Sequence, residues 1–226
     1  MSVGSDFKFS EPFKLTDQMY DDYHENGFLI IRHMFDKDEI DKIEKCVTSE
    51  QFMENRYSLE DKENKIVRVQ WKHPGSDITG IAARSEKIVN TCEKVLARSN
   101  KCGRLDHHVY DGQNQIAEES RLQSIKERCP HIYAVMERGD VLFLHSNTLH
   151  YSSPNRSQMR RLGFLMCYNK ATNDSVIKHH HAQYTPIHKV PDSAMKECSN
   201  YTDFSGKEFE HPSTNTTMIG RKDLSH

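Results

Sequence analysis

Two hydrophobic periodicities divide the sequence near residue 130, and this division limits the possible folds more than any single motif does. Before it, apolar residues recur at helical spacing, as Ile40, Ile43 and Val47 do. After it, apolar residues alternate with others, as within residues 132–136 and 160–168. The first part is therefore predicted to be mainly helical, and the second to run strand–turn–strand.

The first part contains clear signals for where its helices begin and end. Thr16 is a good N-cap for a helix that Gly27 stops, and residues 28–31 form a short apolar run typical of a buried strand. Residues 36–39 read Asp-Lys-Asp-Glu, a capping box that predicts a second helix. Helical spacing predicts a third helix over residues 85–97.

The remaining segments have simpler patterns. Residues 50–65 are charged and are predicted to form a loop, whereas the alternation over 67–71 predicts a strand. Residues 118–128 are predicted to form a polar helix. A tight turn at Gly139-Asp140 leads into the apolar run 141–144, which predicts a buried strand.

Composition indicates one polar globular domain in a chain of 226 residues. Hydrophobic residues make up 35% of it and charged residues 28%, so either the core is small for the length or some segments are poorly packed. We expect a flexible arm at residues 1–14, a domain at 15–198 and a disordered tail at 199–226.

The charge balance argues against nucleic-acid binding, because 31 basic residues face 33 acidic ones. No apolar run is long enough to span a membrane, and the first residues contain no apolar signal segment. The six cysteines form no CxxC pair. We therefore expect a cytoplasmic protein that binds neither nucleic acid nor membranes.

The residues best suited to binding a metal and a cofactor follow the Gly139-Asp140 turn. The apolar strand 141–144 leads into a segment that contains His150, and Arg161 follows eleven residues later. If the two strands are neighbours, an imidazole and a guanidinium can face one cavity. That pair suits a small dicarboxylate. One end of such a molecule chelates a metal, and the carboxylate at the other end accepts two hydrogen bonds from the Arg guanidinium.

Together these residues resemble the phytanoyl-CoA dioxygenase family of iron(II)- and 2-oxoglutarate-dependent oxygenases. The similar elements are Gly139-Asp140, the apolar strand, His150-Tyr151-Ser152 and Arg161. The stretch from Lys101 is also similar, and the resemblance covers roughly residues 13–97 and 99–195.

The resemblance implies a mainly β fold with flanking helices, a double-stranded β-helix or jelly roll. It implies that His150 is an iron ligand and that Arg161 and Ser152 hold 2-oxoglutarate. The implied chemistry is hydroxylation of a small-molecule or acyl-CoA substrate.

The sequence departs from the family in one respect that bears on activity. The family's iron site is completed by a His-x-Asp pair on a central strand, and no His-x-Asp or His-x-Glu occurs in this chain. The strands that would contain it are missing near residues 97–100, consistent with a skipped exon or a gene-model gap. We therefore expect an incomplete jelly roll.

Other residues could replace the missing iron ligands. His108 and Asp111 are the first candidates, with Asp106 and His107 beside them, but solvated loop residues are the simpler interpretation of this cluster. The histidine tract 179–181 is better interpreted as surface loop.

Two interpretations of function therefore stay open. The chain is either an oxygenase that uses Fe(II) and 2-oxoglutarate through unusual ligands, or an inactive truncated isoform or pseudoenzyme that acts by protein binding. Deleted central strands would also leave open strand edges, which favour a homodimer or aggregation.

Overall fold

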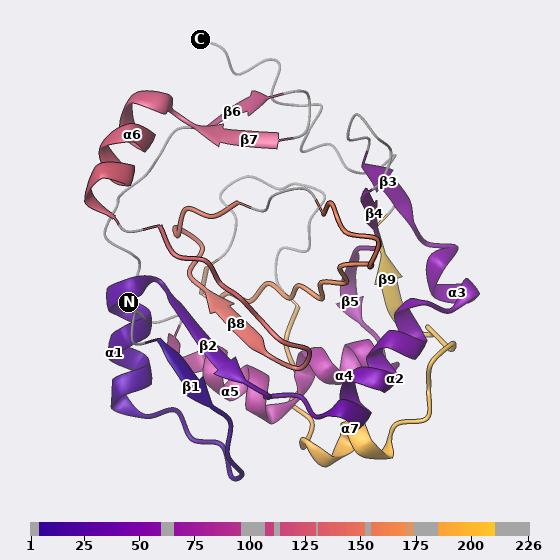
Figure 1. Cartoon of the computed structure of the whole chain (residues 1–226). Helices are drawn as coiled ribbons and strands as arrows, with labels where there is room; N and C mark the ends of the chain where they lie inside the picture. Colours follow the sequence, from indigo (N-terminus) through magenta and orange to yellow (C-terminus); the bar gives the residue numbers. More distant parts are fainter. Residues whose placement is uncertain are drawn as a thin grey trace.

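The computed structural model in Figure 1 describes residues 5–59, 66–95, 107–110, 114–129, 131–151, 155–170, 172–173 and 185–210. These ranges contain helices and short strands. In chain order they are β1 (Asp6–Lys8), α1 (Asp17–Asn26), β2 (Phe28–Arg32), α2 (Lys37–Val47), α3 (Glu50–Met53), β3 (Tyr57–Leu59), β4 (Ile66–Arg68), β5 (Trp71–Pro74), α4 (Ile78–Arg84), α5 (Glu86–Val95), β6 (His107–Tyr110), β7 (Asn114–Ala117), α6 (Glu119–Arg128), β8 (Val141–Leu144), α7 (Ser193–Glu197) and β9 (Lys207–Phe209).

The central sheet has three strands in the order β1-β2-β8. β1 runs parallel to β2, and β8 runs antiparallel to it, with Phe28 opposite Leu144 and Ile31 opposite Val141. The other sheets are the pairs β3-β4, β5-β9 and β6-β7. No closed or curled sheet occurs within the described ranges, so the expected jelly roll is replaced there by a mixed α/β arrangement of small sheets.

The predicted helix signals of the first part are confirmed. The Thr16 hydroxyl accepts from the Met19 N–H at 3.2 Å, and α1 ends at Gly27. At α2, Asp36 accepts from the Glu39 N–H while the Glu39 carboxylate accepts from the Asp36 N–H, each at 2.9 Å. The single cap bond at α1 and the reciprocal capping box at α2 fix the starts of the two helices through local contacts.

The core lies between β2 and the helices. Leu29 and Ile31 of β2 are fully buried, as are Ile78 of α4 and Met195 of α7. Ile88 of α5 is buried in the same cluster. In Figure 1, α4, α5 and α7 gather beside β2 on one side of the molecule. This packing joins the N-terminal part to residues near 195.

Three predicted irregular segments are ordered instead. Residues 50–65 were expected to form a loop but include α3 and β3. Within the expected arm, β1 pairs with β2. Within the expected tail, β9 pairs with β5, and Phe209 packs at 5.8 Å from Phe52 between ring centroids. Residues 6–8 and 207–209 are ordered by pairing with distant segments, which local composition does not reveal.

Two predicted strands after residue 130 are not strands in the structure. Residues 132–136 and 162–168 are extended, but no neighbouring strand pairs with them among the described residues. In the second segment, buried and exposed side chains still alternate. Phe164, Met166 and Tyr168 pack against the core, whereas Leu165 is 84% exposed. A strand needs a hydrogen-bonded partner as well as the right periodicity.

Candidate functional site

The turn before β8 is organised by one buried carboxylate, that of Asp140. Its oxygens accept from the backbone N–H groups of His33 and Glu137 at 2.9 and 2.8 Å. Arg32 donates to it at 2.7 Å, and the Asp140 side chain is 0% exposed. Burial raises the pKa of Asp140, but these bonds outweigh burial and hold its pKa below the ordinary value.

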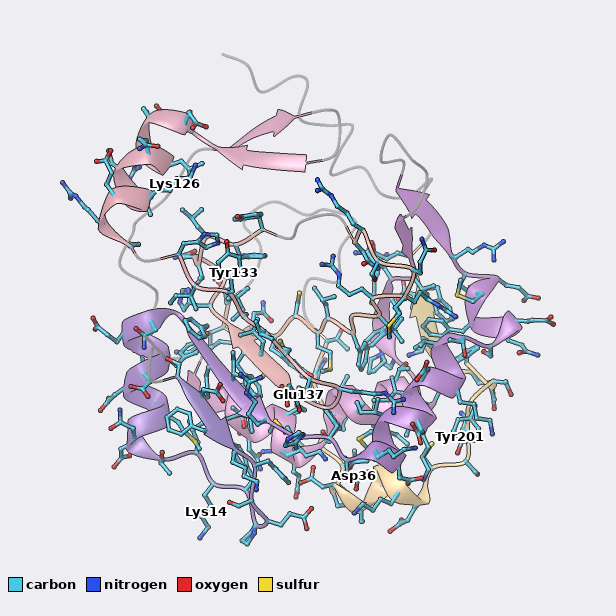
Figure 2. The ribbon with its side chains drawn as sticks, in the orientation of Figure 1. Lys14, Asp36, Lys126, Tyr133, Glu137 and Tyr201 are labelled. Carbon is cyan, nitrogen blue, oxygen red and sulfur yellow. The ribbon has the colours of Figure 1, made fainter. Side chains whose placement is uncertain are left out.

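The neighbouring Gly139 allows this turn to approach the β2–α2 connection. Its φ is +94°, and a Cβ there would lie 2.3 Å from the Phe35 carbonyl oxygen. The Phe35 N–H donates to the Gly139 carbonyl at 3.0 Å. The Gly-Asp pair thus docks the turn, which begins near Glu137 in Figure 2, and sets the register of β8.

β8 ends at Leu144, and His145, the next residue, has a structural role. Its N–H donates to the Gly27 carbonyl at 2.9 Å, and its Nδ1 accepts from the Asn147 N–H at 3.0 Å. The ring is buried and lies 5.9 Å from that of Tyr23 between centroids. These contacts hold the start of the loop that contains His150.

His150 is exposed at the surface of this loop. Its Nδ1 lies 2.9 Å from the carbonyl oxygen of Thr148, so this nitrogen carries the proton in the contact and Nε2 is the nitrogen left to act as an acceptor. The Thr148 hydroxyl in turn donates to the Gly27 carbonyl at 2.8 Å. The loop therefore presents one imidazole nitrogen outward.

The alternation over residues 160–168 predicts that Arg161 points into the barrel and Arg160 outward. In the structure Arg161 does not point into an interior. It is exposed within the extended segment 155–170, and the other register of that segment faces the core. The apolar side chains Phe164, Met166 and Tyr168 take the inner side and pack against the core. Among the described residues, no sheet covers the opposite side of the segment. Arg161 and His150 thus both lie on the surface and not around one enclosed cavity.

The other candidate site residues are only partly described. Ser152 and Asp111, together with Asp106, lie outside the described residues. His108 lies in β6, opposite Ile116 of β7. Their proposed roles toward metal or 2-oxoglutarate stay predictions.

The described residues do not fit the facial triad that the family resemblance implies. Within the described ranges, no group of three His, Cys, Asp or Glu side chains could hold a metal ion. The whole sequence also lacks the His-x-Asp pair. One exposed imidazole is a weak ligand set for Fe(II), which needs a charge-balancing carboxylate.

Two buried ion pairs gave no recognisable signal in the sequence. Lys87 and Glu39 lie 2.8 Å apart between Nζ and Oε1, and Lys207 and Asp77 lie 2.9 Å apart between Nζ and Oδ2. Both members of each pair are almost fully buried. Their partners are far apart in the chain, so no local spacing could have revealed them.

Comparison with known proteins gives one match. The phytanoyl-CoA dioxygenase (PhyH) family model matches residues 80–163. No curated protein and no solved structure matches the chain. Among the described helices, none is both long and apolar enough to cross a bilayer. The matched stretch includes Gly139-Asp140, β8, His150 and Arg161. Over residues 80–163 the chain is therefore similar to the phytanoyl-CoA dioxygenase family.

Proposed function

We propose that this chain is a non-catalytic member of the family and acts by binding another protein chain. The family's parent chemistry is hydroxylation of a small-molecule or acyl-CoA substrate with Fe(II) and 2-oxoglutarate. One observation carries the proposal: His-x-Asp is absent from the sequence. The exposure of His150 supports it. An iron site would have to be built from a single histidine of the usual set.

The surface supports a binding role. Large apolar side chains are exposed along residues 131–165, including Tyr133, Val135, Tyr151, Met159 and Leu165. Tyr133, labelled in Figure 2, is 78% exposed and lies 4.6 Å from the His131 ring between centroids. Exposed apolar residues concentrated in one part of the chain are typical of an interaction surface.

The second candidate function is catalysis through substitute ligands. It is favoured by the position of His108 in a hairpin strand just before Asp111. In this alternative those two residues would join His150 at the metal. An activity assay separates the two functions.

The assay incubates the purified full chain with Fe(II), 2-oxoglutarate and ascorbate and follows succinate by NMR. We expect no succinate above the level given by His150→Ala. Succinate formation that His150→Ala abolishes would overturn the proposal and assign the enzyme function. His108→Ala and Asp111→Asn would then identify the substitute ligands.

Binding of 2-oxoglutarate gives an independent test. If the cofactor still binds, Arg161→Ala and Arg160→Ala should weaken it equally, because both guanidinium groups are exposed. A loss confined to Arg161→Ala would show that a cofactor pocket closes around Arg161 and would argue for the enzyme.

A further inference from the structure

A separate cavity lies where the end of β5, the turn between β5 and α4, the last residue of α4 and the turn before β9 meet. Its volume is about 150 Å³. The polar residues that line it are His73, Ser76, Arg84, His188 and Ser205, with two prolines and two glycines between them. The described lining includes no acidic side chain. In Figure 1, β5, β9 and α4 lie together on the side opposite α1.

The donors around this cavity are largely unused. Arg84 donates from Nε to the Gly80 carbonyl at 3.3 Å and from Nη2 to the Gly75 carbonyl at 3.2 Å. Those bonds hold the guanidinium in place and leave Nη1 without a partner in the described structure. The side chains of His73, Ser76 and His188 likewise make no hydrogen bond or ion pair within the described residues.

Ser205 offers no free hydroxyl proton to a ligand in the cavity. Its hydroxyl donates to the Asp203 carboxylate at 2.5 Å, and its N–H donates to the same oxygen at 2.9 Å. The hydroxyl proton of Ser205 is therefore engaged. The donors that remain come from one guanidinium, two imidazoles and the hydroxyl of Ser76.

The wall on the β9 side is held by buried contacts. Gly75 has φ +68°, and a Cβ there would lie 2.8 Å from Cβ of Lys207. The Lys207 amine pairs with Asp77 at 2.9 Å and donates to the Pro74 carbonyl at 2.5 Å. The turn that contains Ser76 is thus fixed to β9 before any ligand arrives.

The wall on the α4 side is held by backbone bonds. The Val190 N–H donates to the Arg84 carbonyl at 2.9 Å, and the Glu86 N–H donates to the Val190 carbonyl at 3.0 Å. These bonds fix the segment that contains His188 beside the end of α4. A preformed site loses little conformational entropy when it binds a ligand.

We propose that this cavity binds a phosphate group. A water molecule occupies about 30 Å³ of liquid, so the cavity has room for a tetrahedral oxyanion. A guanidinium with a free N–H edge matches phosphate oxygens, and an imidazole can donate an N–H in either tautomer. The Arg84 charge would repel a cation, and the described lining offers no carboxylate to bind one. A metal ion is therefore not the favoured ligand.

The test titrates the full chain with inorganic phosphate and with phenyl phosphate, at constant ionic strength set with chloride. Binding is read from backbone amide shifts at residues 73–76, 186–190 and 205–206, and affinity from calorimetry. A preference for phenyl phosphate would indicate a phosphomonoester as the ligand, and a preference for inorganic phosphate the free ion.

Variants then locate the site. Ser76→Asp places a negative charge in the cavity and should weaken binding at least about tenfold, whereas the neutral, similarly sized Ser76→Asn should change it less than about twofold. His188→Ala should weaken binding about tenfold, because it removes one donor to a charged group. His131→Ala is the matched control at an exposed histidine elsewhere and should have no effect.

Absence of saturable shifts in these segments would overturn the proposal. So would binding that Ser76→Asp and His188→Ala leave unchanged. Because none of these residues belongs to the His150 and Arg161 region, the outcome is independent of the activity assay.

Discussion

The two parts of the chain differ in how apolar residues are used. In the packed region, formed by residues 5–59, 66–95 and 185–210, apolar side chains of β2, α4, α5 and α7 are buried in one core. In the extended region, residues 131–137, 145–151 and 155–170, side chains such as Tyr133 and Leu165 face solvent. β8 links the two by pairing with β2.

The difference shows that family motifs can survive without the architecture in which the family uses them. Gly139-Asp140 still forms a docked turn, because its partners, the β2–α2 connection and Arg32, are present in the packed region. His150 and Arg161 need neighbouring strands to face one cavity, and among the described residues those strands are not there. Within the described residues the local motifs are therefore retained, but His150 and Arg161 are not brought together by paired strands.

The largest expected effect is in the packed region, at the buried Lys207–Asp77 pair. Burial lowers the pKa of Lys207, and the Asp77 carboxylate offsets part of that shift. Lys207→Met leaves a buried, unpaired carboxylate and should lower the free energy of unfolding by about 3–5 kcal/mol, measured by urea denaturation.

The control for that prediction is an exposed pair on the same strands. Lys72 lies 3.4 Å from Glu208, with Glu208 largely exposed. Lys72→Met should cost less than about 1 kcal/mol. Equal effects of the two substitutions would contradict the assignment of β9 to the packed region.

An intermediate effect is expected at the junction of the two regions. Asp140→Asn weakens the bonds to Arg32 and to the backbone of His33 and Glu137, and should cost about 2 kcal/mol in denaturation at pH 7. Arg32 keeps its pair with Asp6, which limits the loss.

The same junction predicts a pH dependence. The folded-state pKa of Asp140 is depressed, so its contribution is present above the unfolded-state pKa of about 3.9 and is lost as pH falls through the folded-state value. The stability difference between the unmodified chain and Asp140→Asn should shrink in acid below pH ~4. A difference that grows in acid would contradict the depressed pKa.

The smallest effect on stability is expected in the extended region. Leu165→Lys and Val135→Lys should change the free energy of unfolding by less than about 0.5 kcal/mol, because both side chains already face solvent. We propose a second copy of the chain as the first partner of this surface. Both substitutions should then lower the self-association seen by light scattering, whereas Arg160→Lys should not.

The parts of the fold that depend on neighbours in sequence could be predicted. The capping box of α2, the end of α1 at Gly27 and the strand β8 follow from spacing within a few residues. β9 and the Lys207–Asp77 pair could not be predicted, because they depend on contacts between distant segments. Residues 162–168 fail in the opposite direction. Their alternation predicts a strand, but among the described residues no neighbouring strand pairs with them.

The candidate site was predictable only in its residue types. His150 and Arg161 were identified from motif and spacing, and the family match over residues 80–163 supports the resemblance that singled them out. Their exposure could not be predicted, because it depends on whether neighbouring strands are present. The absent His-x-Asp pair was the one signal in the sequence that this site would not assemble.

Amide hydrogen exchange measured segment by segment tests the contrast between the two regions most directly. In a closed jelly roll, residues 160–168 would form a paired strand with slow exchange, as expected for β2. We predict that residues 28–32 exchange slowly, near the rate of global unfolding, whereas residues 160–168 exchange at least about a hundredfold faster. Equal protection of the two segments would contradict the account and show that the family's sheet closes around His150 and Arg161.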